Sequence, residues 1–165
     1  MSYLIILRGP MGSGKTEVSQ YLRGELEDSD ILDLDVNAND PIENLDKVLG
    51  KKNVVGELYH GNSHTTNPKW IKEFQGRGYT ILSVVLNASL ETHIKRLAKR
   101  PDKRGRNDVE HHYMKFHNEP KPNFSALAGI EEISIDTDEK EINQIGDEVL
   151  RFLDKRATAA KQPSS

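Results

Sequence analysis

The chain has 165 residues, of which 35% are hydrophobic and 30% charged, and its formal net charge is −3. This length favours one domain with a substantial core, and no apolar stretch approaches the roughly 18 residues that indicate a membrane span. The absence of cysteine excludes disulfides, thiolate metal sites and cysteine nucleophiles, and with an N-terminus that lacks secretory-signal features it predicts a cytoplasmic location.

The first predicted elements are a strand over residues 3–7 and a helix that begins after a glycine-rich turn. The strand is the apolar run YLIIL. The helix is indicated by side chains that recur on one helical face, namely Val18, Tyr21, Leu22 and Leu26. The turn between them, GPMGSGKT, therefore has a strand before it and a helix after it.

This turn matches the phosphate-binding pattern G-x-x-x-x-G-K-[ST] at every position, and it has the strand–helix context that the pattern requires. The glycines allow successive backbone N–H groups to point into one concavity, and the positive end of the following helix favours the same anion. We expect Lys15 to reach the β and γ phosphates of ATP and Thr16 to bind Mg²⁺ through its hydroxyl. The predicted ATP-binding residues of the turn are Gly9, Pro10, Met11, Gly12, Ser13, Gly14, Lys15 and Thr16.

Acidic residues end two further predicted strands, over residues 31–36 and 53–58. Within ILDLDV, Asp33 and Asp35 lie on the same face of the strand, and Asp35 is nearer its carboxyl end. Glu57 lies near the end of NVVGEL. An acid at this position is suited to hold Mg²⁺ through water or to orient a substrate, so Glu57 is a candidate metal-site residue.

The rest of the chain continues the alternation of strands and helices. A helix containing KWIKEF is predicted to begin at Asn67-Pro68, which resembles an N-cap followed by proline at the first helical position. The alternation implies βαβ units, right-handed crossovers and a parallel sheet covered on both faces. The later predicted elements are a strand over 80–86, a helix over 90–98, a helix around 109–116, a strand over 131–136 and a helix over 142–153.

The stretch KRLAKRPDKRGR, residues 95–106, carries seven Lys or Arg and one acidic residue. Two interpretations are open: a solvated helix end whose cations the helix dipole favours, or a mobile lid over about residues 100–107 that closes over ATP. A proline and a glycine within the stretch suit a lid. The candidate ATP-binding residues of the lid are Arg100, Arg104 and Arg106, because the arginine fork binds two phosphate oxygens at once.

Other classes of nucleotide-binding protein fit this sequence less well. A GTPase should carry an N-K-x-D motif, which is absent, and the D-x-x-G at residues 102–105 lies in a charged stretch with no strand before it. An ABC-type ATPase would need its signature sequence, and a large motor or AAA+ module needs a longer chain. A small phosphotransferase is the class that remains.

The order of these features resembles that of the small P-loop kinases, in particular the group that contains the kinase domain of phage polynucleotide kinase, zeta toxins and gluconate kinase. The likeness spans most of residues 1–153 and rests on the glycine-rich turn, the acidic second strand, LNASLETHIKRLAKR with the basic stretch, and a late IDT. It implies a three-layer α/β P-loop NTPase fold with a five-stranded parallel sheet of order 2-3-1-4-5 and ATP at the carboxyl ends of the strands. We assign a kinase domain to residues 1–156 and expect a disordered tail over 157–165.

The resemblance also implies roles for residues outside the glycine-rich turn. In the resembled kinases an Asp at the end of strand two accepts the proton of the substrate hydroxyl, which makes Asp35 the candidate catalytic base and Asp33 the reserve candidate. Lys15 and Arg104 complete the predicted catalytic set. After the last strand, residues 136–138 occupy the position where such kinases pass their chain beside the adenine, so we expect backbone contacts there.

Together these features predict an ATP- and Mg²⁺-dependent kinase with a hydroxyl acceptor. A nucleoside or polynucleotide 5′-hydroxyl and a small sugar or polyol are both open as acceptors. The alternative is a non-catalytic or regulatory ATP-binding protein. A nucleic-acid-binding protein that uses the basic stretch alone is disfavoured by the net negative charge.

Overall fold

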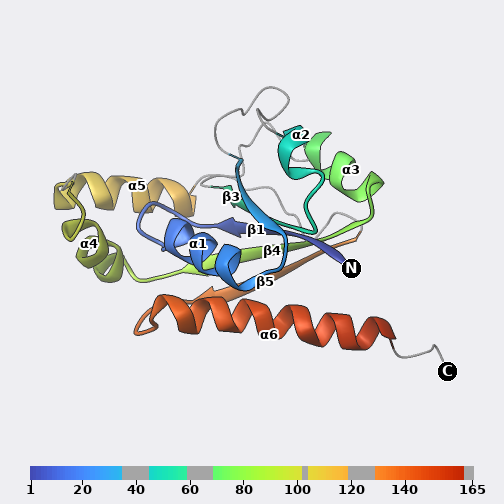
Figure 1. The fold of residues 1–165 in the computed structure, drawn as a ribbon. Helices are drawn as coiled ribbons and strands as arrows, with labels where there is room; N and C mark the ends of the chain where they lie inside the picture. The colour runs from blue at the N-terminus through green and yellow to red at the C-terminus, as the bar shows by residue number, and fades with distance from the viewer. Residues whose placement is uncertain (35–44, 59–68, 102–103, 119–128, 162–165) are drawn as a thin grey trace.

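The computed structural model describes residues 1–34, 45–58, 69–101, 104–118 and 129–161. Within these residues, five strands form one parallel sheet of order β2-β3-β1-β4-β5, which confirms the predicted sheet and its order (Figure 1). The strands are β1 (Ser2–Arg8), β2 (Ser29–Asp33), β3 (Asn53–Leu58), β4 (Tyr79–Asn87) and β5 (Ile130–Asp136).

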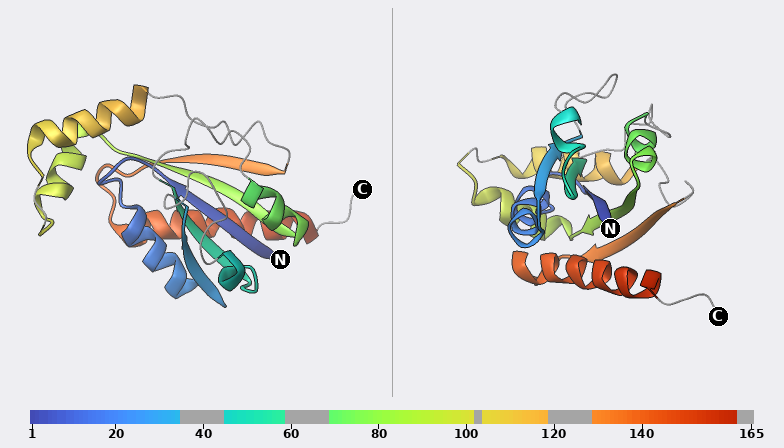
Figure 2. Two further views of the ribbon diagram at one scale, coloured as in Figure 1. Left: turned by 90° about the horizontal axis from the view of Figure 1, so that it is seen from above. Right: turned by 45° about the vertical axis from the view of Figure 1, so that its right-hand side comes forward.

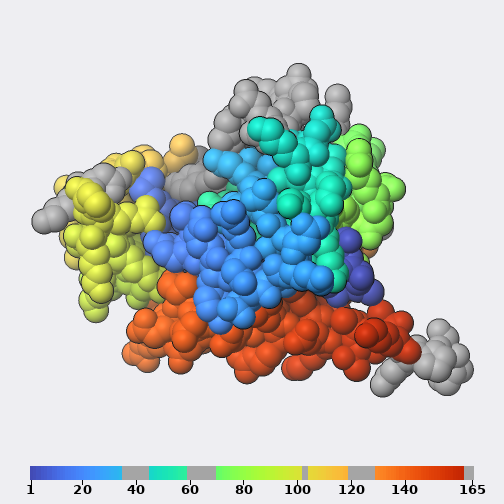
Figure 3. All heavy atoms as spheres, viewed as in Figure 1, coloured from blue at the N-terminus to red at the C-terminus, as the bar shows by residue number. Residues whose placement is uncertain are grey.

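Helices cover both faces of this sheet because side chains of the central strand alternate between two apolar clusters. Leu4 and Ile6 of β1 pack with α2 and α3, whereas Ile5 and Leu7 pack with α1 and α6, and all four are fully buried. Figure 3 shows α6 as a continuous band beside α1. The helices are α1 (Lys15–Glu25), α2 (Leu45–Val48), α3 (Lys69–Gly76), α4 (Leu90–Ala98), α5 (Arg106–Asn118) and α6 (Ile142–Lys161).

The remaining two helices, α4 and α5, pack against each other rather than over a face of the sheet. Both lie beyond the carboxyl ends of the strands, as the two views in Figure 2 show. The turn that joins β1 to α1 lies at the same end of the molecule (Figure 1). The fold thus brings α4 and the glycine-rich turn together, although many residues separate them in the chain.

The predicted strands are all present, and their starts shift by at most two residues. Helix α2 was not predicted, because four residues are too few to show a helical period. The predicted disordered tail begins too early: α6 continues to Lys161, five residues past the predicted domain end at 156. The segment ATAAK that extends it is rich in alanine, the strongest helix former. Residues 162–165 lie outside the described residues.

A buried charge lies at the end of β1, immediately before the glycine-rich turn. Arg8 is only 3% exposed, and its guanidinium donates a hydrogen bond to Oε2 of Glu132 on β5 at 2.5 Å. The Ser83 hydroxyl of β4 donates to the same carboxylate oxygen at 2.8 Å. Burial lowers the pKa of Arg8, and the neighbouring Glu132 opposes that change. The contacts join three adjacent strands beneath the turn.

Replacement of this buried cation should destabilise the fold. We expect Arg8→Met to lower the free energy of unfolding by about 2–4 kcal/mol, because the partly buried Glu132 carboxylate loses its partner. Denaturant unfolding followed by circular dichroism measures the change. The double variant Arg8→Met/Glu132→Gln should lose less than the single variant. A loss below about 0.5 kcal/mol for Arg8→Met, as for an ordinary surface substitution, would contradict this role.

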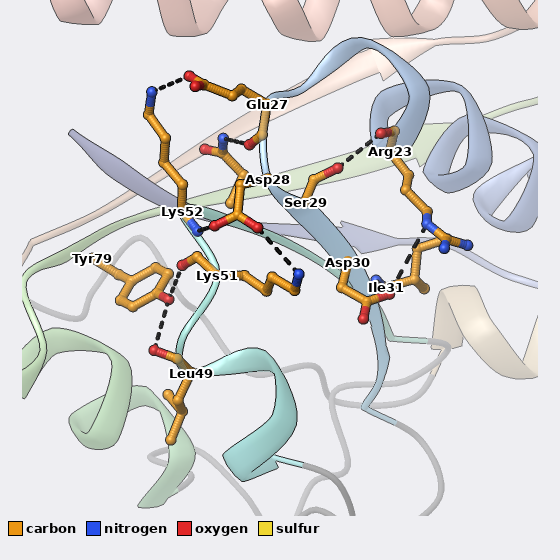
Figure 4. A network of polar contacts seen from close by, with 11 residues as sticks. Arg23, Glu27, Asp28, Ser29, Asp30, Ile31, Leu49, Lys51, Lys52 and Tyr79 are labelled. Carbon is orange, nitrogen blue, oxygen red and sulfur yellow. Dashed lines mark hydrogen bonds and ion pairs between the residues drawn. The ribbon is translucent and has the colours of Figure 1, made fainter.

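A second polar network joins elements at the amino ends of the strands (Figure 4). The Asp28 carboxylate accepts hydrogen bonds from the Lys51 side chain and the Lys52 backbone N–H, both at 3.1 Å. The Lys51 bond, followed by the Lys52 bond, holds the pKa of Asp28 below its ordinary value. The Tyr79 hydroxyl donates to the Leu49 carbonyl at 3.1 Å. This network fixes the turns before β2 and β3, at the opposite end of the sheet from the glycine-rich turn.

Candidate functional site

The glycine-rich turn over residues 9–16, called the P-loop from here on, connects β1 to α1 at the carboxyl end of the central strand. Gly12 and Gly14 have φ angles of 80° and 94°, in the left-handed region that favours glycine. Gly14 is also the N-cap of α1, and no described side chain caps this helix. The positive end of α1 is therefore available to an anion.

Lys15, the first residue of α1, folds back onto the P-loop. Its Nζ donates hydrogen bonds to the carbonyl of Gly9 at 2.6 Å and to that of Pro10 at 3.1 Å. Phosphate oxygens bound in the loop would be stronger acceptors for this ammonium group than the two carbonyls are, because phosphate oxygens carry negative charge. The contact between Lys15 and phosphates stays a prediction, and the position of the ammonium group fits it.

Thr16 and Ser19 of α1 meet Glu57 of β3 beside the P-loop. The Thr16 hydroxyl donates to Glu57 Oε2 at 3.4 Å, and the Ser19 hydroxyl contacts the other carboxylate oxygen of Glu57. These are oxygen donors of the kind that Mg²⁺ prefers, so Thr16 and Glu57 fit the predicted ion. Ser19 was not predicted, although its spacing of three from Thr16 places both on one helical face. In the described part of the chain, no three His, Asp or Glu side chains cluster as an all-protein metal site, whereas Mg²⁺ in nucleotide sites is commonly held by one or two protein ligands together with phosphates and water.

Two more acidic residues were predicted to belong to this edge of the sheet. Asp33 is the last residue of β2 and is the register partner of Glu57 on β3. Because paired residues of parallel strands point to the same face, both carboxylates lie on the side of the sheet that α1 covers. Asp35, the predicted catalytic base, lies outside the described residues, and its role stays a prediction.

Arg96 of α4 joins the P-loop to the turn after β5. Its guanidinium donates to the carbonyls of Gly12 and Ser13 at 3.4 and 3.3 Å. The same group donates to the Thr137 hydroxyl at 3.0 Å and to the Thr137 carbonyl at 2.9 Å. The backbone N–H of Thr137 in turn donates to the Asn87 carbonyl at 2.7 Å. Arg96 was not among the site residues predicted from the sequence, but the structure places it against the P-loop.

His93 lies directly behind the P-loop, one turn of α4 before Arg96. It is fully buried, and its Nδ1 is 3.3 Å from the position that a Cβ on Gly12 would occupy. Burial, followed by the charge of Arg96, lowers the pKa of His93 to about 4. The nearby backbone of Met11 and Gly12 opposes this decrease in pKa. Among the described residues, however, neither ring nitrogen has a partner in hydrogen-bond geometry. The imidazole is therefore neutral at physiological pH.

The three arginines of the predicted lid all lie near acidic side chains. These pairs are largely exposed and contribute little to stability. Arg100 is the one that approaches the P-loop, since its partner directly follows Thr16. Residues 102–103 lie outside the described residues, and closure of a lid stays a prediction. The pairs are Arg100 with Glu17 at 3.9 Å, Arg104 with Asp108 at 3.0 Å and Arg106 with Glu91 at 2.6 Å.

A protein family described as AAA domain matches residues 5–115, which is more than half of the chain. The chain belongs to the AAA domain family. The matched part of this AAA domain runs from β1 into α5 and includes the P-loop, Glu57 and Arg96. No curated protein sequence matches the chain.

Solved structures resemble this AAA domain along nearly its whole length. A gluconokinase from Sinorhizobium meliloti is 13% identical, with a TM-score of 0.59 over 96% of this chain and 95% of that one. A shikimate kinase from Acinetobacter baumannii, in complex with shikimate, is 19% identical, with a TM-score of 0.58 over 94% and 95%. A thymidylate kinase from Candida albicans is 12% identical, with a TM-score of 0.56 over 94% and 92%. At these identities the likeness establishes the fold, which is that of the small P-loop kinases.

The family match bears on one of the classes that sequence analysis set aside. A large AAA+ module was disfavoured from the sequence, yet the matched family carries the AAA description over residues 5–115. The AAA description thus applies here to a sequence segment that has the fold of a small P-loop kinase. Among the helices that the structure describes, none has the length and apolar character needed to cross a membrane.

Proposed function

We propose that this AAA domain is an ATP-dependent kinase that transfers the γ-phosphoryl group to a hydroxyl acceptor. The observation that carries the proposal is the P-loop at the N-terminus of α1, which no described side chain caps, with the Lys15 ammonium group on the loop and the Thr16–Glu57 contact beside it. The fold shared with a gluconokinase and a shikimate kinase supports the same class of reaction.

Each part of the site has a task in the proposed reaction. The backbone N–H groups of residues 12–16 bind phosphate oxygens, and Lys15 offsets the charge on the β and γ phosphates. Asp35 accepts the acceptor's hydroxyl proton as the acceptor oxygen bonds to the γ-phosphorus. The bond from that phosphorus to the β–γ bridging oxygen breaks, and ADP leaves. The arginines that would offset charge on the transferring group are Arg100, Arg104 and Arg106.

Thr16 and Glu57 are the described residues that would hold Mg²⁺, with Glu57 acting directly or through water. The ion, when bound, neutralises charge on the β and γ phosphates. Ser19 orients the Glu57 carboxylate through the contact between their side chains. The Glu57 carboxylate thereby lies next to the Thr16 hydroxyl.

The metal role of Glu57 predicts a specific defect. Glu57→Gln should raise the Mg²⁺ concentration required for half-maximal activity by about 10- to 100-fold, because the amide can still accept a hydrogen bond but carries no charge. Titration of kinase activity with Mg²⁺ at fixed ATP measures the effect. Glu25→Gln, at the exposed end of α1, is the matched control and should behave as wild type. Identical Mg²⁺ dependence in all three proteins would exclude this role.

A screen for phosphoryl transfer tests the kinase proposal itself. Purified protein, Mg²⁺ and γ-labelled ATP are incubated with gluconate, shikimate, thymidylate, polyols, nucleosides or an oligonucleotide that ends in a 5′-hydroxyl. We expect at least one compound to raise ATP turnover well above hydrolysis and to acquire the label. If the protein binds ATP but no acceptor raises turnover, the kinase proposal fails.

A further inference from the structure

Two side chains of α4 lie behind the P-loop at Gly12. A Cβ on Gly12 would lie 3.1 Å from Cγ of Leu97 and 3.3 Å from Nδ1 of His93. Leu97 is an ordinary core residue at 2% exposure. His93 is different, because both nitrogens of a fully buried ring have no hydrogen-bond partner in the described structure. A buried polar group in this state weakens a fold, so its presence here calls for a reason.

The surroundings of the ring come from three elements. Arg96 is the charged neighbour on its own helix, and α5 contributes Tyr113, with ring centroids 5.2 Å apart, and the titratable His117. The P-loop contributes the backbone of Met11 and Gly12. With a pKa of about 4, the ring carries no charge at physiological pH and keeps one N–H that it can donate. The His93 ring thus lies close to the P-loop backbone but donates no hydrogen bond to it in this structure.

We propose that His93 is a positioning residue for the P-loop. When nucleotide is bound, the His93 ring donates an N–H to the Met11–Gly12 backbone and holds that segment in the phosphate-binding shape. The inference rests on the proposed binding of ATP. It implies that the imidazole is unpaired in the free protein and paired in the complex. Removal of its nitrogens should therefore affect the stability of the free protein and the affinity for nucleotide in opposite directions.

His93→Phe separates these two effects, because it keeps a buried ring and removes both nitrogens. The melting temperature of the free protein should stay equal or rise. The Kd for MgATP, measured by titration calorimetry, should increase roughly 3- to 10-fold, the effect of one net hydrogen bond. Leu97→Met is the matched control: it changes the other side chain behind Gly12 at nearly constant volume and should keep Kd within about twofold.

Two amide variants identify the donor nitrogen. His93→Asn places an amide nitrogen close to the position of Nδ1, the ring nitrogen that faces Gly12, and should restore most of the affinity. His93→Gln directs its amide nitrogen toward the position of Nε2 and should not. If His93→Phe does not fold, the comparison of these two variants decides: a lower Kd for His93→Asn supports the proposal, and equal values overturn it.

The remaining outcomes also separate this inference from the proposed function. Equal Kd values for wild type and His93→Phe would overturn the positioning role alone. A lower melting temperature together with weaker binding in His93→Phe would also overturn it, since general packing would explain both. Failure of the wild-type protein to bind MgATP would overturn the proposed function and this inference with it.

Discussion

Asp35→Asn should reduce kcat by roughly 10²- to 10⁴-fold and leave the Kd for MgATP within about threefold of the wild-type value. The amide has nearly the same size as the carboxylate but cannot accept the proton of the acceptor hydroxyl. In the proposed site, phosphates are bound by the P-loop backbone and Lys15, so nucleotide affinity should not depend on Asp35. Steady-state kinetics with the acceptor identified by the screen give kcat, and titration calorimetry gives the affinity.

Asp33→Asn is the matched control for this experiment. Asp33 ends β2 beside Glu57, two residues before Asp35, and carries the same functional group. We expect this variant to lose much less activity than Asp35→Asn. The opposite order would identify Asp33 as the base. Wild-type turnover in both variants would contradict catalysis at the end of β2 and would favour a regulatory ATP-binding protein.

Lys15→Ala should lower kcat/KM by about 10²- to 10³-fold, the effect of losing one fixed group that stabilises charge in a transition state. The substitution removes the cation that lies on the loop and its hydrogen bonds to the Gly9 and Pro10 carbonyls. Much of the loss should appear as weaker binding of MgATP, which calorimetry measures separately from turnover.

Lys99→Ala controls for the loss of one positive charge. Lys99 is exposed at the C-cap of α4, so this variant should keep wild-type kinetics. Denaturant unfolding of both variants establishes that Lys15→Ala remains folded. If folded Lys15→Ala keeps more than about a tenth of the wild-type kcat/KM, the P-loop is not the catalytic phosphate site.

The fold could be predicted because each strand has a local signal and the resemblance supplies the strand order. Gly56 is a position where the local signal is weak, since glycine is uncommon within strands. In the structure β3 is continuous, and Gly56 pairs with Ile6 and Leu32 on the neighbouring strands. A Cβ at this position would lie 2.6 Å from Cδ1 of Leu34, so the glycine leaves room for a core side chain.

The candidate site divides into a local part and a part assembled by the fold. The P-loop is a continuous motif, and the meeting of Thr16 with Glu57 follows from parallel strands that end at one edge of the sheet. Arg96 could not be placed in the same way, because it bonds to Gly12 across 84 positions of the sequence. His93 likewise resembles any histidine on an amphipathic helix until the fold brings it against the P-loop.

The central claim, that the P-loop binds a nucleoside triphosphate, is tested most directly by titration calorimetry of MgATP into the wild-type protein at two temperatures. We expect saturable binding with one ATP per chain, and strongly weakened binding for Lys15→Ala under the same conditions. Absence of binding heat at millimolar MgATP and at both temperatures, from wild-type protein that still unfolds cooperatively, would contradict the claim.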